Sequence, residues 1–218
     1  SLYLFSSATQ GTQDIILPFG FGAPYTIGYF NFSAKFYVNP ATGAYFNFQA
    51  ENTPGVTWSL DVKMDLGTIV LENMDSGINY LTATYPEGVW FDLKIIVDLT
   101  TNNWELFIDN QSLGSFTNTV NQIASLDLYP IIGHQFYVDD VCYTYTPFIP
   151  LAYDMAAIDL NMVSNLALTS APFTVSGDIV SISATTITSL DVNYSINGAA
   201  PIVDNLSGLN LLLFDTLN

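Results

Sequence analysis

The stretch that decides the fold class is PEGVWFDLKIIVDLTTNNWELFIDNQSLGSF, residues 86–116. Apolar residues occupy every second position from Phe91 to Leu99, which is the period of a strand with one wholly apolar face. The polar turn Thr100–Asn103 separates this strand from a second alternating segment, Trp104–Asp109, and another turn leads into Ser112–Phe116. Two successive hairpins of this kind predict the middle of an antiparallel sheet.

The same alternation continues on both sides of this stretch. Alternating segments such as Ala44–Ala50 and Val56–Met64 are separated by turns rich in Pro, Gly and Asn, such as Asn39–Gly43. Roughly ten strands or more, at a spacing of roughly 8–12 residues, are typical of a β-sandwich or jelly roll. No window shows a sustained helical period. We therefore predict an all-β protein, with an antiparallel jelly-roll β-sandwich over residues 1–149.

A proline-bracketed break, Thr146–Pro150, precedes a change of composition: residues 150–218 contain no Trp or Lys and many Ser, Thr, Asn and Leu. About five short strands predict a smaller Ig-like β-sandwich here, although such a fold needs about seven. The second domain is therefore predicted to be incomplete, with the apolar segment Leu211–Phe214 lacking a partner. We expect the missing strands to come from a continuation of the chain or from a neighbouring copy that donates Ser1–Phe5.

The charge balance excludes several classes of partner. Lys35, Lys63 and Lys94 are the only basic side chains, against 20 acidic ones, and the net charge is −17. Such a chain has no basic face for nucleic acid and is repelled by anionic lipid, whereas its carboxylates are available as Ca²⁺ ligands. The sequence has no apolar run of about 18 residues, so we expect no membrane insertion. The single cysteine, Cys142, excludes a disulfide framework, and its alternating strand predicts a core thiol.

The first block resembles the LamG-like, concanavalin A-type jelly-roll modules of secreted Bacteroidota proteins that leave the cell by the type IX route. The resemblance rests on an ordered set of segments: Gly43–Gln49, Pro54–Trp58, Tyr85–Phe91, Ile96–Leu99, Trp104–Asp109 and Phe136–Val141. The second block is similar to the Ig-like repeats that follow such modules, through Ser176–Ser181 and Ile187–Gly198. The resemblance implies an extracellular or cell-surface protein that engages a glycan or surface polymer through the jelly roll, with an Ig-like spacer.

Tryptophans are the natural candidates for sugar binding, because an indole face packs against a pyranose ring. Trp104 opens a strand beside a polar turn, so we expect it to be the exposed ligand-binding tryptophan. Trp90 begins the most apolar strand, and in LamG-like modules a tryptophan at this place packs in the core. The predicted ligand-binding residues are Trp104, Tyr45 and Trp58.

Asp139 and Asp140 stand together in the last strand of the first block. Since consecutive strand residues face opposite ways, one carboxylate is predicted to turn inward, where it is costly without a cation or several donors. Jelly rolls of the resembled type often hold a structural Ca²⁺ near such a strand. We therefore predict a Ca²⁺ site at Asp139 and Asp140; the alternative is that loop N–H groups satisfy the inner carboxylate.

A catalytic site is not predicted. His134 is the only histidine and arginine is absent. Asp92 and Asp98 share a strand face but lie about 20 Å apart, whereas glycoside hydrolysis needs carboxylates within about 5–9.5 Å, although neighbouring strands could still bring two acids together. We predict a non-catalytic extracellular binding or adhesion protein. The alternatives are a structural subunit of an extracellular fibre or surface assembly completed by strand donation, and accessory domains of a larger secreted hydrolase.

Overall fold

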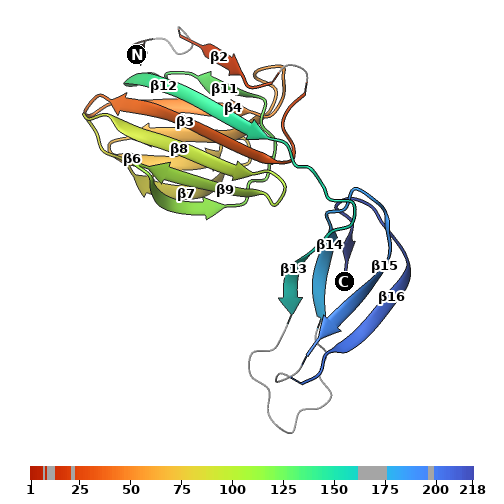
Figure 1. Cartoon of the computed structure of the whole chain (residues 1–218). Coiled ribbons are helices and arrows are strands. Elements are labelled where there is room, and N and C mark those ends of the chain that lie inside the picture. The colour runs from red at the N-terminus through yellow and green to blue at the C-terminus, as the bar shows by residue number, and fades with distance from the viewer. Residues whose placement is uncertain (7, 9–12, 21–22, 162–175, 196–198) are drawn as a thin grey trace. The chain divides into compact units, whose positions relative to one another are not determined.

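The computed structural model describes residues 1–6, 8, 13–20, 23–161, 176–195 and 199–218 (Figure 1). The chain divides into two compact units, Ser1–Phe148 and Ile149–Asn218, within the proline-bracketed segment Thr146–Pro150. Every regular element of the described residues is a strand, and the strands pair antiparallel. The prediction of an all-β, antiparallel fold is therefore confirmed. Among these residues, no helix is long and apolar enough to span a bilayer.

Unit 1, residues 1–148, is a sandwich of two six-stranded sheets (Figure 1). Sheet A contains, in spatial order, β1 (Leu2–Phe5), β12 (Gln135–Thr146), β3 (Tyr29–Val38), β8 (Phe91–Asp98), β9 (Asn103–Ile108) and β10 (Gln111–Phe116). Sheet B contains, in spatial order, β2 (Ile15–Pro18), β11 (Ser125–Leu128), β4 (Gly43–Gln49), β5 (Trp58–Asp65), β6 (Thr68–Asn73) and β7 (Ile78–Thr84). The chain crosses repeatedly between the sheets, in the manner of a jelly roll, so each sheet combines distant parts of the sequence.

The two hairpins predicted from residues 86–116 are β8–β9 and β9–β10. Ile95 pairs with Leu106 in the first, and Trp104 pairs with Phe116 in the second. Strand β10 lies at the edge of sheet A. The stretch therefore extends from the interior of the sheet to one edge, and the expectation that it forms the middle of the sheet is wrong.

The core of unit 1 lies between the two sheets and is rich in aromatic side chains. On β3, Phe32 and Phe36 alternate with polar residues and face the core, as Phe46 and Phe48 do on β4. The rings of Phe36 and Phe46 have centroids 5.3 Å apart, and those of Phe32 and Phe48 are also 5.3 Å apart. Aromatic pairs at such distances stabilise a fold beyond their burial alone. The apolar side chains that occupy every second position of these strands thus hold the two sheets together.

Strand β12 contains a bulge between Asp139 and Cys142, where its register with β3 shifts. Asp140 has a positive φ of 49°, and the extra residue inverts the alternation beyond it. Val138 is buried before the bulge, whereas Tyr143 packs against the core after it. Cys142 is therefore exposed, and the prediction of a core thiol is wrong.

Unit 2, residues 149–218, contains two small sheets. One has the order β13 (Met155–Asn161), β14 (Ser176–Ser181) and β17 (Thr216–Leu217), and the other pairs β15 (Ile187–Tyr194) with β16 (Ile202–Leu211). Among its described residues, Ile187 is the one buried hydrophobic side chain, while Leu160 and Val203 are exposed. The Ig-like assignment stays a prediction. The expected strand donor, Ser1–Phe5, contains β1, which pairs with β12 of its own chain, and donation to a neighbouring copy stays a prediction.

Candidate functional site

A row of polar side chains lies on the face of sheet B that points away from the core. On β4, Phe46 and Phe48 face the core, so Tyr45, Asn47 and Gln49 face the opposite way. These three outward side chains are nonetheless buried, Asn47 and Gln49 to 1% exposure. Outward polar residues of a sheet are usually solvated. The burial of these three polar side chains therefore makes this part of the outer face a candidate binding site.

Two aspartates complete this row from neighbouring strands. In the registers of sheet B, Asn47 of β4 lies opposite Asp61 of β5 on one side and opposite Asp127 of β11 on the other. Both carboxylates are buried. We call Tyr45, Asn47, Gln49, Asp61 and Asp127 the polar cluster.

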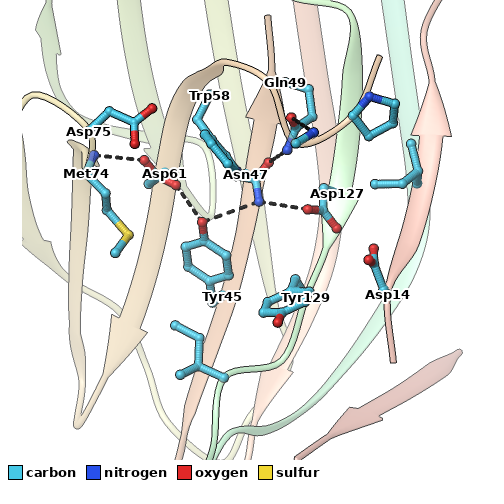
Figure 2. A pocket seen from close by; sticks show the side chains of 14 residues that line it. Asp14, Tyr45, Asn47, Gln49, Trp58, Asp61, Met74, Asp75, Asp127 and Tyr129 are labelled. Atoms are coloured by element: carbon cyan, nitrogen blue, oxygen red, sulfur yellow. Dashed lines mark hydrogen bonds between the residues drawn. The ribbon is translucent and has the colours of Figure 1, made fainter. Parts of the chain in front are cut away.

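Hydrogen bonds join the polar cluster into one chain (Figure 2). The Tyr45 hydroxyl donates to Asp61 Oδ1 at 2.5 Å and lies 3.3 Å from the amide nitrogen of Asn47 that donates to it. Asn47 Nδ2 also donates to Asp127 Oδ2 at 3.0 Å, and Gln49 Nε2 donates to Asn47 Oδ1 at 2.5 Å. These contacts fix the orientation of each polar group before any ligand arrives, which lowers the cost of binding.

The polar cluster forms the floor of a pocket of about 460 Å³, a volume within the usual range of small-molecule sites. Trp58 and Tyr129, both half-buried, add aromatic surface to its lining, and Asp14 and Asp75 add two exposed carboxylates (Figure 2). None of the described lining residues is a lysine. The pocket thus combines aromatic faces, preoriented hydrogen-bonding groups and strongly negative charge.

Burial shifts the proton equilibria of the polar cluster. It raises the pKa of Asp61, although the Met74 N–H, which donates to Oδ2 at 3.0 Å, and the Tyr45 hydroxyl partly oppose this. Burial also raises the pKa of Asp127 to about 6, with Asn47 opposing the rise and the neighbouring Asp14 adding to it. The pKa of Tyr45 is raised by burial and by Asp61, so its hydroxyl stays protonated and remains a donor.

Two of the predicted ligand-binding residues, Tyr45 and Trp58, line this pocket. The third, Trp104, is 0% exposed, because it lies on the core face of β9 with Leu106 and Ile108. Its indole Nε1 donates to Asn102 and Asn121 at 3.2 Å each. The prediction that Trp104 is exposed to bind a ligand is therefore wrong.

The prediction that Trp90 packs in the core is also wrong. It precedes β8 and alternates out of phase with the buried Phe91, so it is 45% exposed rather than packed in the core. Its ring lies 5.8 Å from that of Tyr37 and 6.4 Å from that of Tyr137, on the outer face of sheet A. The two partly exposed tryptophans, Trp58 and Trp90, therefore belong to different sheets.

The predicted metal pair, Asp139 and Asp140, lies at the β12 bulge rather than on a regular strand. Asp140 is exposed and Asp139 is partly exposed, so the expectation of an inward carboxylate is wrong. Asp139 Oδ1 accepts the Asp140 N–H at 2.8 Å, and Oδ2 lies 3.2 Å from the Ser1 amino group. The Asp140 N–H bond is the main cause that lowers the pKa of Asp139. Within the described residues, no three acidic, His or Cys side chains converge as metal ligands, and Ca²⁺ stays a prediction.

Comparison with known proteins gives structural similarity only. No family model and no curated protein sequence matches the chain. Sheep galectin-11 has 13% identity and a TM-score of 0.45, over 60% of this chain and 96% of its own. A variant of human galectin-16 has 18% identity and a TM-score of 0.45, over 61% and 95%. The carbohydrate-binding module CBM66 from Bacillus subtilis has 9% identity and a TM-score of 0.42, over 64% and 99%. At these values, neither a ligand nor a residue role follows for this chain.

Proposed function

We propose that unit 1 is a non-catalytic carbohydrate-binding module and that its site is the pocket above the polar cluster. The observation that carries the proposal is the buried row of hydrogen-bonding side chains on the outer face of sheet B, beside the half-buried Trp58. Sugar rings present hydroxyl groups at their edges and C–H groups on their faces. Amide, phenol and carboxylate groups match the hydroxyls, and an indole face matches the C–H groups.

The charge of the pocket restricts the class of sugar. Four carboxylates line it, those of Asp14, Asp61, Asp75 and Asp127, and no lysine does among its described lining. Uronic acids and sulfated sugars would bring a further negative charge into this field, which costs free energy in a partly desolvated site. The proposed ligands are therefore neutral or positively charged saccharides.

The hydrogen bonding of the acids supports binding rather than hydrolysis. Both oxygens of Asp61 already accept hydrogen bonds, from the Tyr45 hydroxyl and the Met74 N–H. A glycosidase needs two carboxyl groups that are free to act on the scissile bond. In the polar cluster, only Asp127 retains a carboxylate oxygen without a hydrogen-bond partner. The two acids of the polar cluster therefore suit the positioning of a ligand.

A glycan array probed with the full chain, with Trp58→Ala and with Trp90→Ala tests the proposal. The Trp90 variant is a matched control, because that side chain is also partly exposed but lies outside the pocket lining. Trp58→Ala is expected to weaken binding at least about tenfold, or about 1.4 kcal/mol, while Trp90→Ala leaves it unchanged. Unchanged binding by Trp58→Ala, or no saccharide binding by the intact chain, contradicts the proposal.

The proposal includes an extracellular or cell-surface location and an adhesive role, with unit 2 as an Ig-like spacer. These parts rest on the resemblance of the sequence to secreted LamG-like modules. They are consistent with the net charge of −17, which favours solubility in a salt-rich medium.

One observation favours a structural role as a second candidate. The described strands of unit 2 expose large apolar side chains, among them Ile158, Leu160, Ile202 and Val203. Strands with open edges and exposed apolar faces are templates for pairing with another chain. A fibre subunit is expected to form concentration-dependent polymers in analytical ultracentrifugation, which Val203→Lys on β16 would suppress. A monomer at all concentrations contradicts this candidate.

A further inference from the structure

The carboxyl group of Asp127 is incompletely satisfied by the protein. The residue is 8% exposed, and its Oδ2 accepts the Asn47 amide at 3.0 Å. Its Oδ1 has no hydrogen-bond partner among the described residues. Figure 2 shows this free oxygen on the side of Asp14, which also lines the pocket. A buried carboxylate oxygen without a donor is costly, so a group from outside is expected to meet it.

Among the described residues, the charged groups around Asp127 include no cation. Asp14 precedes β2, the edge strand that pairs with β11, and contributes a second carboxylate. From β4, Asn47 contributes the one amide bond, and Tyr45 is committed to Asp61 of β5. The exposed Lys63 of β5 does not belong to the lining. Asp14 raises the pKa of Asp127 both through its charge and through a side-chain hydrogen bond, so the two carboxyl groups are close neighbours whose repulsion a positively charged donor would offset.

We propose that the pocket selects an amino sugar, whose protonated amine bridges the carboxyl groups of Asp14 and Asp127 while the sugar ring lies against Trp58. The inference rests on the proposed saccharide binding and specifies its ligand class. An ammonium group offers three donors and a positive charge. A sugar hydroxyl offers one donor and no charge, so it leaves most of the repulsion between the two acids in place.

Two other occupants fit the observations less well. A metal ion requires several converging ligands, and the described residues contain no such group of three acidic, His or Cys side chains. A proton shared between Asp14 and Asp127 would satisfy the pair only in acid, since the pKa of Asp127 is about 6. The proton and the ammonium compete for the same oxygen. Binding of the amino sugar is therefore expected to weaken as the pH falls through about 6.

Three β-1,4-linked oligosaccharides test the inference, because they differ only at carbon 2 of each ring. Oligomers of glucosamine carry an ammonium group there, those of N-acetylglucosamine carry an acetamide, and those of glucose carry a hydroxyl. We expect calorimetric titration of the full chain at neutral pH to show at least about tenfold tighter binding of the glucosamine oligomer. This preference is expected to shrink at high salt, where exposed charges are screened.

Substitutions of the lining aspartates test which carboxyl groups cause the preference for the glucosamine oligomer. Asp127→Asn keeps an oxygen that accepts the Asn47 bond and removes the charge, so it is expected to abolish the preference for the glucosamine oligomer over the glucose oligomer. Asp75→Asn is the matched control, since it removes a lining charge away from the Asp14–Asp127 pair and is expected to retain most of the preference. Should Asp127→Asn fail to fold, as judged by circular dichroism, the exposed Asp14→Asn serves the same purpose.

The outcomes separate this inference from the proposed function. Equal binding of the three oligomers, or a preference that survives both Asp127→Asn and Asp14→Asn, overturns the amino-sugar assignment and leaves saccharide binding intact. Equally tight binding of a lysine-rich peptide also overturns it, because recognition would then need no sugar. Failure of all saccharides to bind refutes the proposed function itself.

Discussion

The two faces of β4 bury side chains to similar extents but for different purposes. Phe46 and Phe48 are 0% exposed and pack against aromatic rings of β3. One residue away in each case, Asn47 and Gln49 are 1% exposed and bind other polar groups. The first face provides the nondirectional free energy of apolar burial, whereas the second fixes donors and acceptors in a chosen geometry. A single strand thus contributes side chains both to the hydrophobic core and to the candidate site.

The largest expected effect comes from the apolar face. Phe48→Ala removes a ring within 5.3 Å of Phe32 and leaves a cavity, so the free energy of unfolding should fall by about 3–5 kcal/mol in urea titrations. Saccharide affinity of the protein that remains folded is expected to be unchanged, because the pocket keeps its polar groups. Loss of affinity with little loss of stability would break the distinction between the two faces.

A smaller effect is expected from the polar face. Asn47→Leu removes the donor to Asp127 and Tyr45 and the acceptor of Gln49, leaving buried groups unpaired. The free energy of unfolding should fall by about 2–3 kcal/mol, and saccharide binding should be lost. Asn31→Leu is the matched control: this residue of sheet A is only partly buried, and its side-chain hydrogen bond to Thr144 lies at the surface. A larger loss of stability for the control would contradict the assignment.

The smallest expected effect concerns pH. The pKa of Asp127 is raised in the folded state to about 6, so the folded protein binds this proton more tightly than the unfolded chain does. Its contribution to stability is therefore fully present below about pH 4 and is lost as the pH rises through about 6, at a cost of about 1–3 kcal/mol.

Urea unfolding across this pH range, compared with Asp127→Asn, isolates the contribution. The stability of the intact chain relative to the variant should fall between about pH 4 and about pH 6. Asp65→Asn, an exposed change on the same sheet, should show no such trend. A difference between the chain and Asp127→Asn that is constant with pH would show that the carboxyl group is not buried as described.

The sequence predicts where each strand lies better than it predicts which strands are paired in a sheet. Alternation identifies β4 and β11, and places Asn47 and Asp127 on their non-core faces, because apolar residues flank each of them. That these strands are adjacent, and that Asn47 lies opposite Asp127, depends on pairing between segments about 80 residues apart, which local period does not encode. Two wrong predictions have the same origin. A turn beside Trp104 does not show that this side chain faces the core, and the bulge that turns Cys142 outward appears only in the pairing of β12 with β3.

The central claim, that saccharide binds at the outer face of sheet B, can be tested through the three tryptophans. In a ¹⁵N-labelled chain each indole N–H gives its own NMR signal, assigned with Trp58→Phe and Trp90→Phe. Titration with a β-1,4-linked glucosamine oligomer should shift the signal of Trp58, which lines the pocket. The buried Trp104 and the exposed Trp90 of sheet A should be unaffected. A shift of Trp90 with none of Trp58 would place the ligand on the opposite sheet and contradict the claim.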